Sequence, residues 1–217
     1  MTRVLEEQFL IVDDHPVVLD GVHLLLQSIR PNAMFCMAAS GSEALSMINS
    51  QNTPDWAFID INLPDIQGLE LVKLLKTNNA TCKVVVLSSE LDGEILYQAI
   101  AAGADGVLSK SFSKDIFELC IMTVELGTTF LSSEHASELK YYKDSLMREQ
   151  QHIRENLSKR QFEVLVLLAQ GHGNKDISEQ MYISQSTVKS HVSSLMFLFE
   201  ASNRTHCVEK ARQLKII

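Results

Sequence analysis

Residues 55–68, DWAFIDINLPDIQG, contain a short apolar run that ends on a carboxylate, Asp60, and then turns through Asn62, Leu63 and Pro64. A short apolar run followed by turn formers is typical of a buried strand. A negative charge at the end of such a strand is either a local cap or a group placed there for chemistry. The residues that follow the other predicted strands distinguish between these two interpretations.

Similar apolar runs recur through the first 130 residues, separated by stretches with apolar residues at three- and four-residue spacing. This alternation predicts an α/β fold: a five-stranded, doubly wound parallel sheet covered by helices on both faces. The strand at 83–87 (KVVVL) does not alternate apolar and polar residues, as expected for a strand buried on both sides. The predicted strands are 9–12, 35–38, 57–59, 83–87 and 106–108, and the predicted helices are 17–29, 41–50, 67–77, 93–102 and 114–126.

The chain changes character after residue 130. Residues 132–156 are polar and contain neither glycine nor proline, which is typical of an exposed helix or helical linker. A smaller all-α block follows, with four helices predicted near 159–170, 174–181, 185–199 and 205–213. We therefore expect a domain at 1–130, a helical linker at 131–155 and a second domain at 156–217.

Charge is divided unequally between these parts. Residues 1–155 carry 11 Lys and Arg against 22 Asp and Glu, whereas residues 156–217 carry 8 against 5. An acidic first part and a basic last part indicate two separate tasks, with nucleic acid as the natural partner of the second.

Composition narrows the class of protein further. The chain is 46% hydrophobic and 21% charged and has no run of about 18 apolar residues, so we expect no membrane helix. Its first residues lack the pattern of a signal peptide, so we expect a cytoplasmic protein. Its cysteines show no C-x-x-C spacing, which favours reduced packing residues over metal ligands or disulfides. They are Cys36, Cys82, Cys120 and Cys207.

Polar residues follow the predicted strands at one edge of the sheet. Asp13 and Asp14 follow the first strand, Asp60 ends the third, Ser88 follows the fourth and Lys110 the fifth. Ligands of doubly wound sheets bind at this edge. Three carboxylates repel one another unless a cation such as Mg²⁺ intervenes, and a carboxylate can itself be the nucleophile of phosphoryl transfer. Any one of these residues could be a simple cap, but the ordered set favours a site that receives a phosphoryl group.

Four motifs carry a family resemblance: LIVDDHP, FIDINLPDIQGLEL, VVVLSSE and AGADGVLSKS. Together they resemble the receiver domain of two-component response regulators, over about residues 7–127. The resemblance implies that Asp60 is the phosphoacceptor, that Ser88 is the switch hydroxyl and that Lys110 contacts the phosphoryl group. It also implies a sensor histidine kinase or phosphotransfer protein as partner, and Mg²⁺ as cofactor. The implied metal ligands are Asp13, Asp14, Asp60 and the backbone carbonyl of Asn62.

One position departs from the receiver pattern. Receivers usually carry an aromatic residue three positions before the lysine, and this chain has Val107 there. A valine cannot make the inward swing of an aromatic ring. We therefore expect phosphorylation of Asp60 to reach the surface by a different or weaker route.

The second block contains a helix, a tight turn and a helix in DISEQMYISQSTVKSHVSSLMFLF. Ser184 is placed to cap the second helix, whose Val188, Val192 and Leu195 would face a core. Its other side would present small polar and basic side chains, which suits the major groove of DNA. These outward residues are Thr187, Lys189, Ser190, His191, Ser193 and Ser194.

Residues 156–217 resemble the LuxR-type helix-turn-helix domain, most clearly in the run NKDI…IS…TVKSH…NRT. Its pairing with a receiver resembles the NarL/FixJ group of response regulators. The resemblance implies a homodimer that binds double-stranded DNA, with the DNA-binding domain released when the receiver is phosphorylated. Base edges would be read by Lys189, Ser190 and Ser193, and phosphates would be contacted by Asn174, Lys175, Thr187, His191 and Arg204.

Two further features leave alternatives open. Phe197 and Leu198 stand where this family commonly has basic residues, and they either pack inside or form an exposed apolar patch for a dimer or domain contact. His172, between two glycines, is expected to serve the turn before the helix-turn-helix rather than to bind metal.

The sequence therefore predicts a phosphorylation-controlled transcription regulator and no enzyme. Two alternatives remain. One is a regulator that acts without phosphorylation, through a ligand or protein partner. The other is an aspartyl-phosphate phosphatase or phosphotransferase, for which we see neither a substrate pocket nor a turnover-promoting acid or base.

Overall fold

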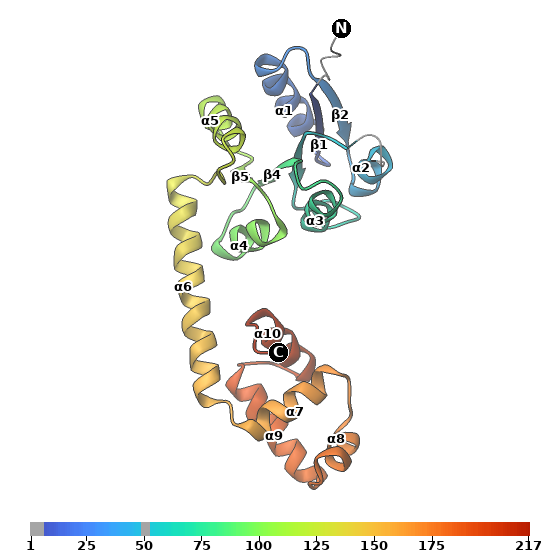
Figure 1. Ribbon diagram of the computed structural model, residues 1–217, viewed down its shortest axis with the longest axis vertical. Coiled ribbons are helices and arrows are strands. Elements are labelled where there is room, and N and C mark those ends of the chain that lie inside the picture. The colour runs from blue at the N-terminus through green and yellow to red at the C-terminus, as the bar shows by residue number, and fades with distance from the viewer. Residues whose placement is uncertain (1–6, 49–52) are drawn as a thin grey trace. The chain divides into compact units, whose positions relative to one another are not determined.

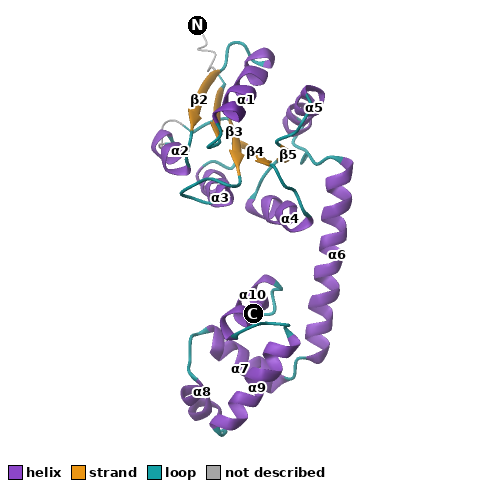
Figure 2. Cartoon of the chain, turned by 180° about the vertical axis from the view of Figure 1, so that it is seen from behind, coloured by secondary structure: helices purple, strands orange, loops and turns teal. Residues whose placement is uncertain are grey.

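The protein is described by a computed structural model that covers residues 7–48 and 53–217. The chain divides into two compact units, Met1–Tyr142 and Lys143–Ile217. The first unit contains the strands and the second is helical (Figures 1 and 2). No helix in the described ranges is both long and apolar enough to cross a membrane.

The first unit is built on a parallel sheet with the strand order β2-β1-β3-β4-β5. The strand order reverses at β1, which pairs with β2 on one side and with β3 on the other, and such a switch point is where doubly wound sheets bind ligands. All five predicted strands are confirmed, each extended by one or two residues. They are β1 (Gln8–Val12), β2 (Met34–Ala38), β3 (Trp56–Asp60), β4 (Lys83–Ser88) and β5 (Gly106–Ser109).

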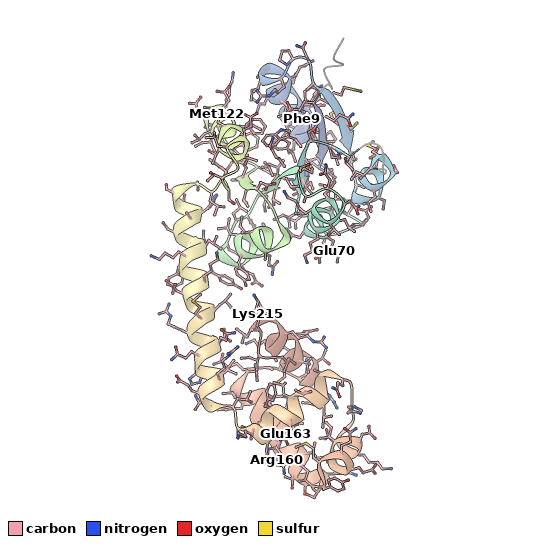
Figure 3. All side chains as sticks on the ribbon, viewed as in Figure 1. Phe9, Glu70, Met122, Arg160, Glu163 and Lys215 are labelled. Carbon is pink, nitrogen blue, oxygen red and sulfur yellow. The ribbon has the colours of Figure 1, made fainter. Side chains whose placement is uncertain are left out.

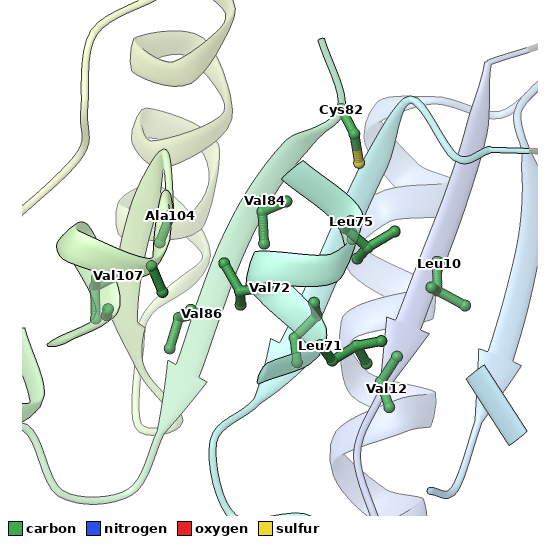
Figure 4. Close-up of a cluster of buried hydrophobic side chains, with 14 of the residues drawn as sticks. Leu10, Val12, Leu71, Val72, Leu75, Cys82, Val84, Val86, Ala104 and Val107 are labelled. Atoms are coloured by element: carbon green, nitrogen blue, oxygen red, sulfur yellow. The ribbon is translucent and has the colours of Figure 1, made fainter. Parts of the chain in front are cut away.

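Helices cover both faces of the sheet, as the unbroken apolar runs predict. Phe9 and Ile11 of β1 face α1 (Pro16–Ile29) and α5 (Lys114–Glu125). Leu10 and Val12 face the opposite cluster, shown in Figure 4, which is covered by α2 (Gly41–Met47), α3 (Gly68–Asn78) and α4 (Gly93–Ala102). Figure 3 marks the buried Phe9 and the exposed Met122 on the outer side of α5. Because successive strand residues alternate, each strand stabilises both layers.

Local signals account for the helix ends. The Ser40 side chain accepts a hydrogen bond from the Glu43 amide at the start of α2, and Gly103, with φ +103°, ends α4. The predicted helix 41–50 is shorter in the structure, because α2 ends at Met47. Residues 49 and 50 of that prediction lie outside the described residues.

The stretch after α5 extends the pairing of the sheet. Phe130 forms a parallel bridge with Gly106, and the Val107 amide donates to the Phe130 oxygen at 3.1 Å. Helix α6 (Ser133–Asn156) follows, and its Leu139 is buried in the cluster under α4. Tyr142 lies against Tyr97 of α4, with ring centroids 5.8 Å apart. The first half of the linker helix is therefore packed on the first unit.

The second unit has its own core. Its helices are α7 (Lys159–Ala169), α8 (Asn174–Met181), α9 (Gln185–Leu198) and α10 (Arg204–Gln213). Buried side chains from all four pack together, and Ile153 from the end of α6 joins them with 1% exposure. The turn between α8 and α9 is made by Tyr182 in the left-handed region, with φ +54°. The predicted helix-turn-helix is confirmed.

Candidate functional site

Four side chains gather where β1 and β3 end. Asp13 directly follows β1, and Asp60 is the last residue of β3, the strand paired with β1. Both carboxylates are buried, with 0% and 1% exposure, whereas Asp14 is partly exposed. One oxygen from each of Asp13, Asp14 and Asp60, and one nitrogen of His15, lie within 4.8 Å of one another.

Lys110 reaches this cluster from the end of β5. Its Nζ lies 2.7 Å from Asp13 Oδ2 and 2.8 Å from Asp60 Oδ2, as ion pairs without hydrogen-bond alignment. Burial alone would lower the pKa of Lys110, but the side-chain contacts with Asp13 and Asp60 outweigh it and the pKa is raised. Lys110 is therefore a cation shared by two buried carboxylates.

Asp60 Oδ1 differs from the other oxygen of its carboxylate. It is buried and has neither a hydrogen-bond partner nor an ion-pair partner among the described residues. A buried carboxylate oxygen without a partner is costly. Such an oxygen is suited to bind an electrophile or a cation.

Ser88 does not contact Asp60 in this structure. Its buried hydroxyl donates to the backbone oxygen of Glu90 at 2.6 Å and accepts from the Glu90 amide at 3.3 Å. The hydroxyl is therefore engaged by the loop between β4 and α4. Val107 is fully buried in the cluster under α3 and α4, so this position carries no aromatic ring that could move with the hydroxyl.

The loop after β3 is held by its own contacts. Asn62 is exposed on it. Asp65 accepts hydrogen bonds from the amides of Gly41, Ser42 and Ile66, and the pKa of its carboxyl is held below its usual range, first by the Ser42 side chain and then by these amides. The loop ends where the Gly68 amide donates to the Ile61 oxygen at 3.0 Å. These bonds fix the backbone around Asp60.

Sequence reasoning missed the position of His15. Its ring Nδ1 lies 2.7 Å from Asp14 Oδ1 and 3.1 Å from Asp13 Oδ1, and its amide donates to Asp13 Oδ1. The signal was present in DDHP, where a histidine follows both acids directly. The structure adds that the ring turns back over them.

In the second unit, α9 presents one polar face to solvent. The Ser184 side chain caps α9 by accepting from the Thr187 amide at 3.1 Å, as predicted. Val188 and Leu195 are fully buried on the opposite side. The predicted contact residues on α9 lie together on the outer side, with His191 half-buried. The exposed ones are Thr187, Lys189, Ser190 and Ser193.

The remaining predicted contact residues lie beside this helix. Asn174 and Lys175 open α8, and Arg204 opens α10. The Arg204 guanidinium donates to the backbone oxygen of His172 at 2.7 Å, so His172 serves the turn before α8. Phe197 is 88% exposed, whereas its neighbour Leu198 packs on the core. Leu198 therefore packs inside, and Phe197 is exposed.

Comparison with known protein families matches residues 9–121 to the response regulator receiver domain. The chain belongs to the response regulators. Residues 155–211 match the luxR family of bacterial regulatory proteins, so this response regulator combines a receiver with a LuxR-type domain, as in the NarL/FixJ group. It is therefore a DNA-binding transcription regulator of a two-component system.

Individual relatives match this response regulator over nearly their whole length. The transcriptional regulatory protein LnrK of Bacillus subtilis is 30% identical, over 91% of this chain and 93% of its own. The response regulator protein VraR of Staphylococcus aureus is 29% identical, over 96% and 97%. The crystal structure of ChrA, a response regulator of a heme-sensing system, has 27% identity and a TM-score of 0.52, covering 98% of this chain and 99% of its own.

A further solved structure contains nucleic acid. It holds two RcsB dimers bound to two parallel DNAs, and it has 21% identity and a TM-score of 0.54, over 96% of this chain and 98% of its own. At this identity the likeness is one of fold.

Proposed function

We propose that Asp60 accepts a phosphoryl group from a sensor histidine kinase, a phosphotransfer protein or a small phosphodonor. The observation that carries this proposal is the buried, unpartnered Asp60 Oδ1 beside a carboxylate oxygen that Lys110 already neutralises. Oδ1 attacks phosphorus, a P–O bond forms, and the bond between phosphorus and the donor breaks. Lys110 is placed to offset the charge of the incoming oxygens, and the Ser88 hydroxyl would turn from Glu90 to donate to one of them.

The acid cluster suits a divalent metal. Carboxylate oxygens, three of them buried and without a hydrogen-bond partner, form the donor set that Mg²⁺ prefers. Asp13, Asp14, Asp60 and the backbone carbonyl of Asn62 would hold the ion. When bound, Mg²⁺ would offset negative charge on the acids and on the phosphoryl oxygens.

The test is phosphorylation of the full chain by acetyl phosphate, read as a mobility shift on a phosphate-binding gel. The chain should shift only with Mg²⁺ present, and Asp60→Asn should not shift. An unshifted parent chain would contradict the proposal. Steady phosphate release from small phosphate esters would support a phosphatase instead.

We propose that the chain is no enzyme. We also propose that it acts in the cytoplasm.

For the DNA complex, we propose that residues 156–217 form the binding domain, joined to the receiver of residues 1–130 by the linker at 131–155. Lys189, Ser190 and Ser193 would reach base edges. Phosphates would be contacted by Asn174, Lys175, Thr187, His191 and Arg204. The support is the polar outer face of α9, with Asn174, Lys175 and Arg204 at helix N-termini, where backbone amides favour anions.

Matched lysine variants test this face. Lys189→Ala should weaken binding to a selected operator about fivefold or more, because a lysine–guanine contact is worth about 1–3 kcal/mol. Lys215→Ala removes the same charge from the exposed C-terminal end and should leave binding within about twofold. Equal effects of the two variants would contradict the assignment.

We also propose that the phosphorylated chain acts as a homodimer on a two-fold DNA site. The support is the likeness of fold to RcsB, which is bound to DNA as dimers in a solved structure. A second candidate is control without phosphorylation, which the buried Val107 favours because no aromatic switch is present. Promoter activity that survives Asp60→Ala in cells would support this second candidate.

A further inference from the structure

Phe197 lies on the same face of α9 as the hydroxyl side chains. An α-helix turns about 100° per residue, so Phe197 is only about 20° around the axis from Ser190, seven residues earlier. Ser186, Ser193 and Ser194 fall within about 60° of Ser190 on the same count, and all of these side chains are exposed. The buried Val188 and Leu195 lie on the opposite side. Phe197 therefore belongs to the face that is proposed to read DNA.

Its position along the helix sets which part of the groove it can reach. Seven residues rise about 10 Å along α9, so Phe197 and Ser190 would lie over different base pairs. The other proposed base readers offer hydroxyl groups and, at Lys189, an ammonium group, whereas the phenyl ring offers no hydrogen bond. The apolar feature that base edges present in the major groove is the C5-methyl group of thymine.

We propose that Phe197 contacts a thymine methyl group in the major groove, at a base pair other than the one read by Ser190. The contact would cover a ring that is otherwise 88% exposed, and it continues the proposed DNA-reading face without a break. The inference rests on the proposed function of α9 and adds a sequence preference to it. A second copy of this chain is the other occupant that could cover the ring, and the experiment distinguishes the two.

The test replaces thymine by uracil, one position at a time, across an operator selected with the full chain. Uracil lacks only the methyl group. We expect one position in each half-site at which uracil weakens binding about fourfold, the effect of losing one buried methyl group. With Phe197→Ala, thymine and uracil at that position should bind equally, while every other preference is kept.

Phe162→Ala is the matched control, because Phe162 is an exposed phenylalanine on α7. It should keep the uracil-sensitive position. Phe197→Arg should remove that sensitivity and steepen the salt dependence of binding by about one unit, because it adds a phosphate contact.

Three outcomes would overturn the inference or its basis. Specific binding with no uracil-sensitive position contradicts the Phe197 contact alone. A Phe197→Ala chain that stays sensitive to uracil but no longer self-associates in sedimentation assigns the ring to a dimer contact and overturns the proposal. Absence of specific binding, with Lys189→Ala equal to the parent, contradicts the proposed function itself.

Discussion

Gly68 begins α3 directly beside the peptide that carries Asp60. A β-carbon at position 68 would lie 1.9 Å from the backbone oxygen of Asp60, a contact that no rearrangement of side chains can relieve. The backbone that aims Asp60 therefore depends on a residue without a side chain.

We predict that Gly68→Ala lowers the free energy of unfolding by about 1–3 kcal/mol or more and impairs phosphorylation of Asp60, because the β3–α3 loop must move. Gly21→Ala is the matched control, since nothing lies within 4 Å of its added β-carbon inside α1. It should stabilise the protein by about 0.5–1 kcal/mol. Urea unfolding measures both variants, and equal midpoints for Gly68→Ala and the parent would contradict the packing.

The four cysteines should differ in reactivity. Burial raises the pKa of Cys82 and Cys120 to about 12 and that of Cys207 to about 11, whereas Cys36 is exposed on β2. We predict that one thiol reacts rapidly with a disulfide reagent at pH 8, and that all four react in urea. A second fast thiol in the native protein would contradict this.

The same thiols set a pH dependence of stability. The folded protein keeps their protons to higher pH than the unfolded chain does. Their contribution is therefore constant below about pH 8.5, and the free energy of unfolding falls as the pH rises from there toward 11–12.

Single residues also separate what the sequence could predict from what it could not. Asp13 and Lys110 follow strands of one parallel sheet and Asp60 ends another strand of it, so their convergence could be predicted from chain order. The hydrogen-bond acceptor of the Ser88 hydroxyl could not be predicted, because rotation about one bond can direct the hydroxyl to different acceptors. Phe197 and Leu198 are about 100° apart on α9, so one faces solvent and the other the core.

At the scale of elements, α6 packs on α4 with unusual closeness. A β-carbon at Gly93, the first residue of α4, would lie 2.6 Å from Tyr142 Cβ and 3.1 Å from the Glu138 oxygen. Leu139 is buried in the same layer. The loop that holds the Ser88 hydroxyl leads directly into this helix contact.

We predict that Gly93→Ala loosens the start of α6 from α4. Hydrogen exchange of backbone amides in residues 133–142 should become faster, because their helix loses its packing, while amides of β1 and β3 keep the protection of the parent. Gly21→Ala, a helical glycine with open space around it, should change neither region. Unchanged exchange in residues 133–142 would show that α6 does not depend on Gly93.

The linker helix illustrates how far pattern alone reaches. Its polar composition without glycine or proline predicted a helix, and α6 is one. Its contact with α4 joins residues almost fifty positions apart and depends on the fit between Gly93 and Tyr142. The periodicity of the sequence does not predict this close packing between Gly93 and Tyr142.

At the scale of the whole molecule, the two units differ in charge and have separate cores. The change from acidic to basic composition predicted two tasks, and the chain indeed divides in two. Ile153 lies before the proposed boundary at residue 156, yet it is buried in the core of the second unit. Gln150 also donates to the Leu214 oxygen at 2.8 Å.

We therefore predict that a fragment of residues 143–217 folds by itself and is more stable than one of residues 156–217. The difference should be about 2–5 kcal/mol, the usual cost of removing a buried isoleucine side chain. Ile153→Ala in the longer fragment should reproduce most of the loss, and Gln151→Ala on the exposed side of α6 should not. Chemical unfolding measures the series, and equal stability of the two fragments would refute the prediction.

The hydrogen bond from the Ser88 hydroxyl to the Glu90 oxygen has a consequence for the regulator before it is phosphorylated. A hydrogen bond of this kind is worth about 1 kcal/mol net, so turning the hydroxyl toward the proposed phosphoryl site should be disfavoured about fivefold before any phosphate arrives. Before phosphorylation, most molecules should therefore keep the loop between β4 and α4 in the arrangement seen here.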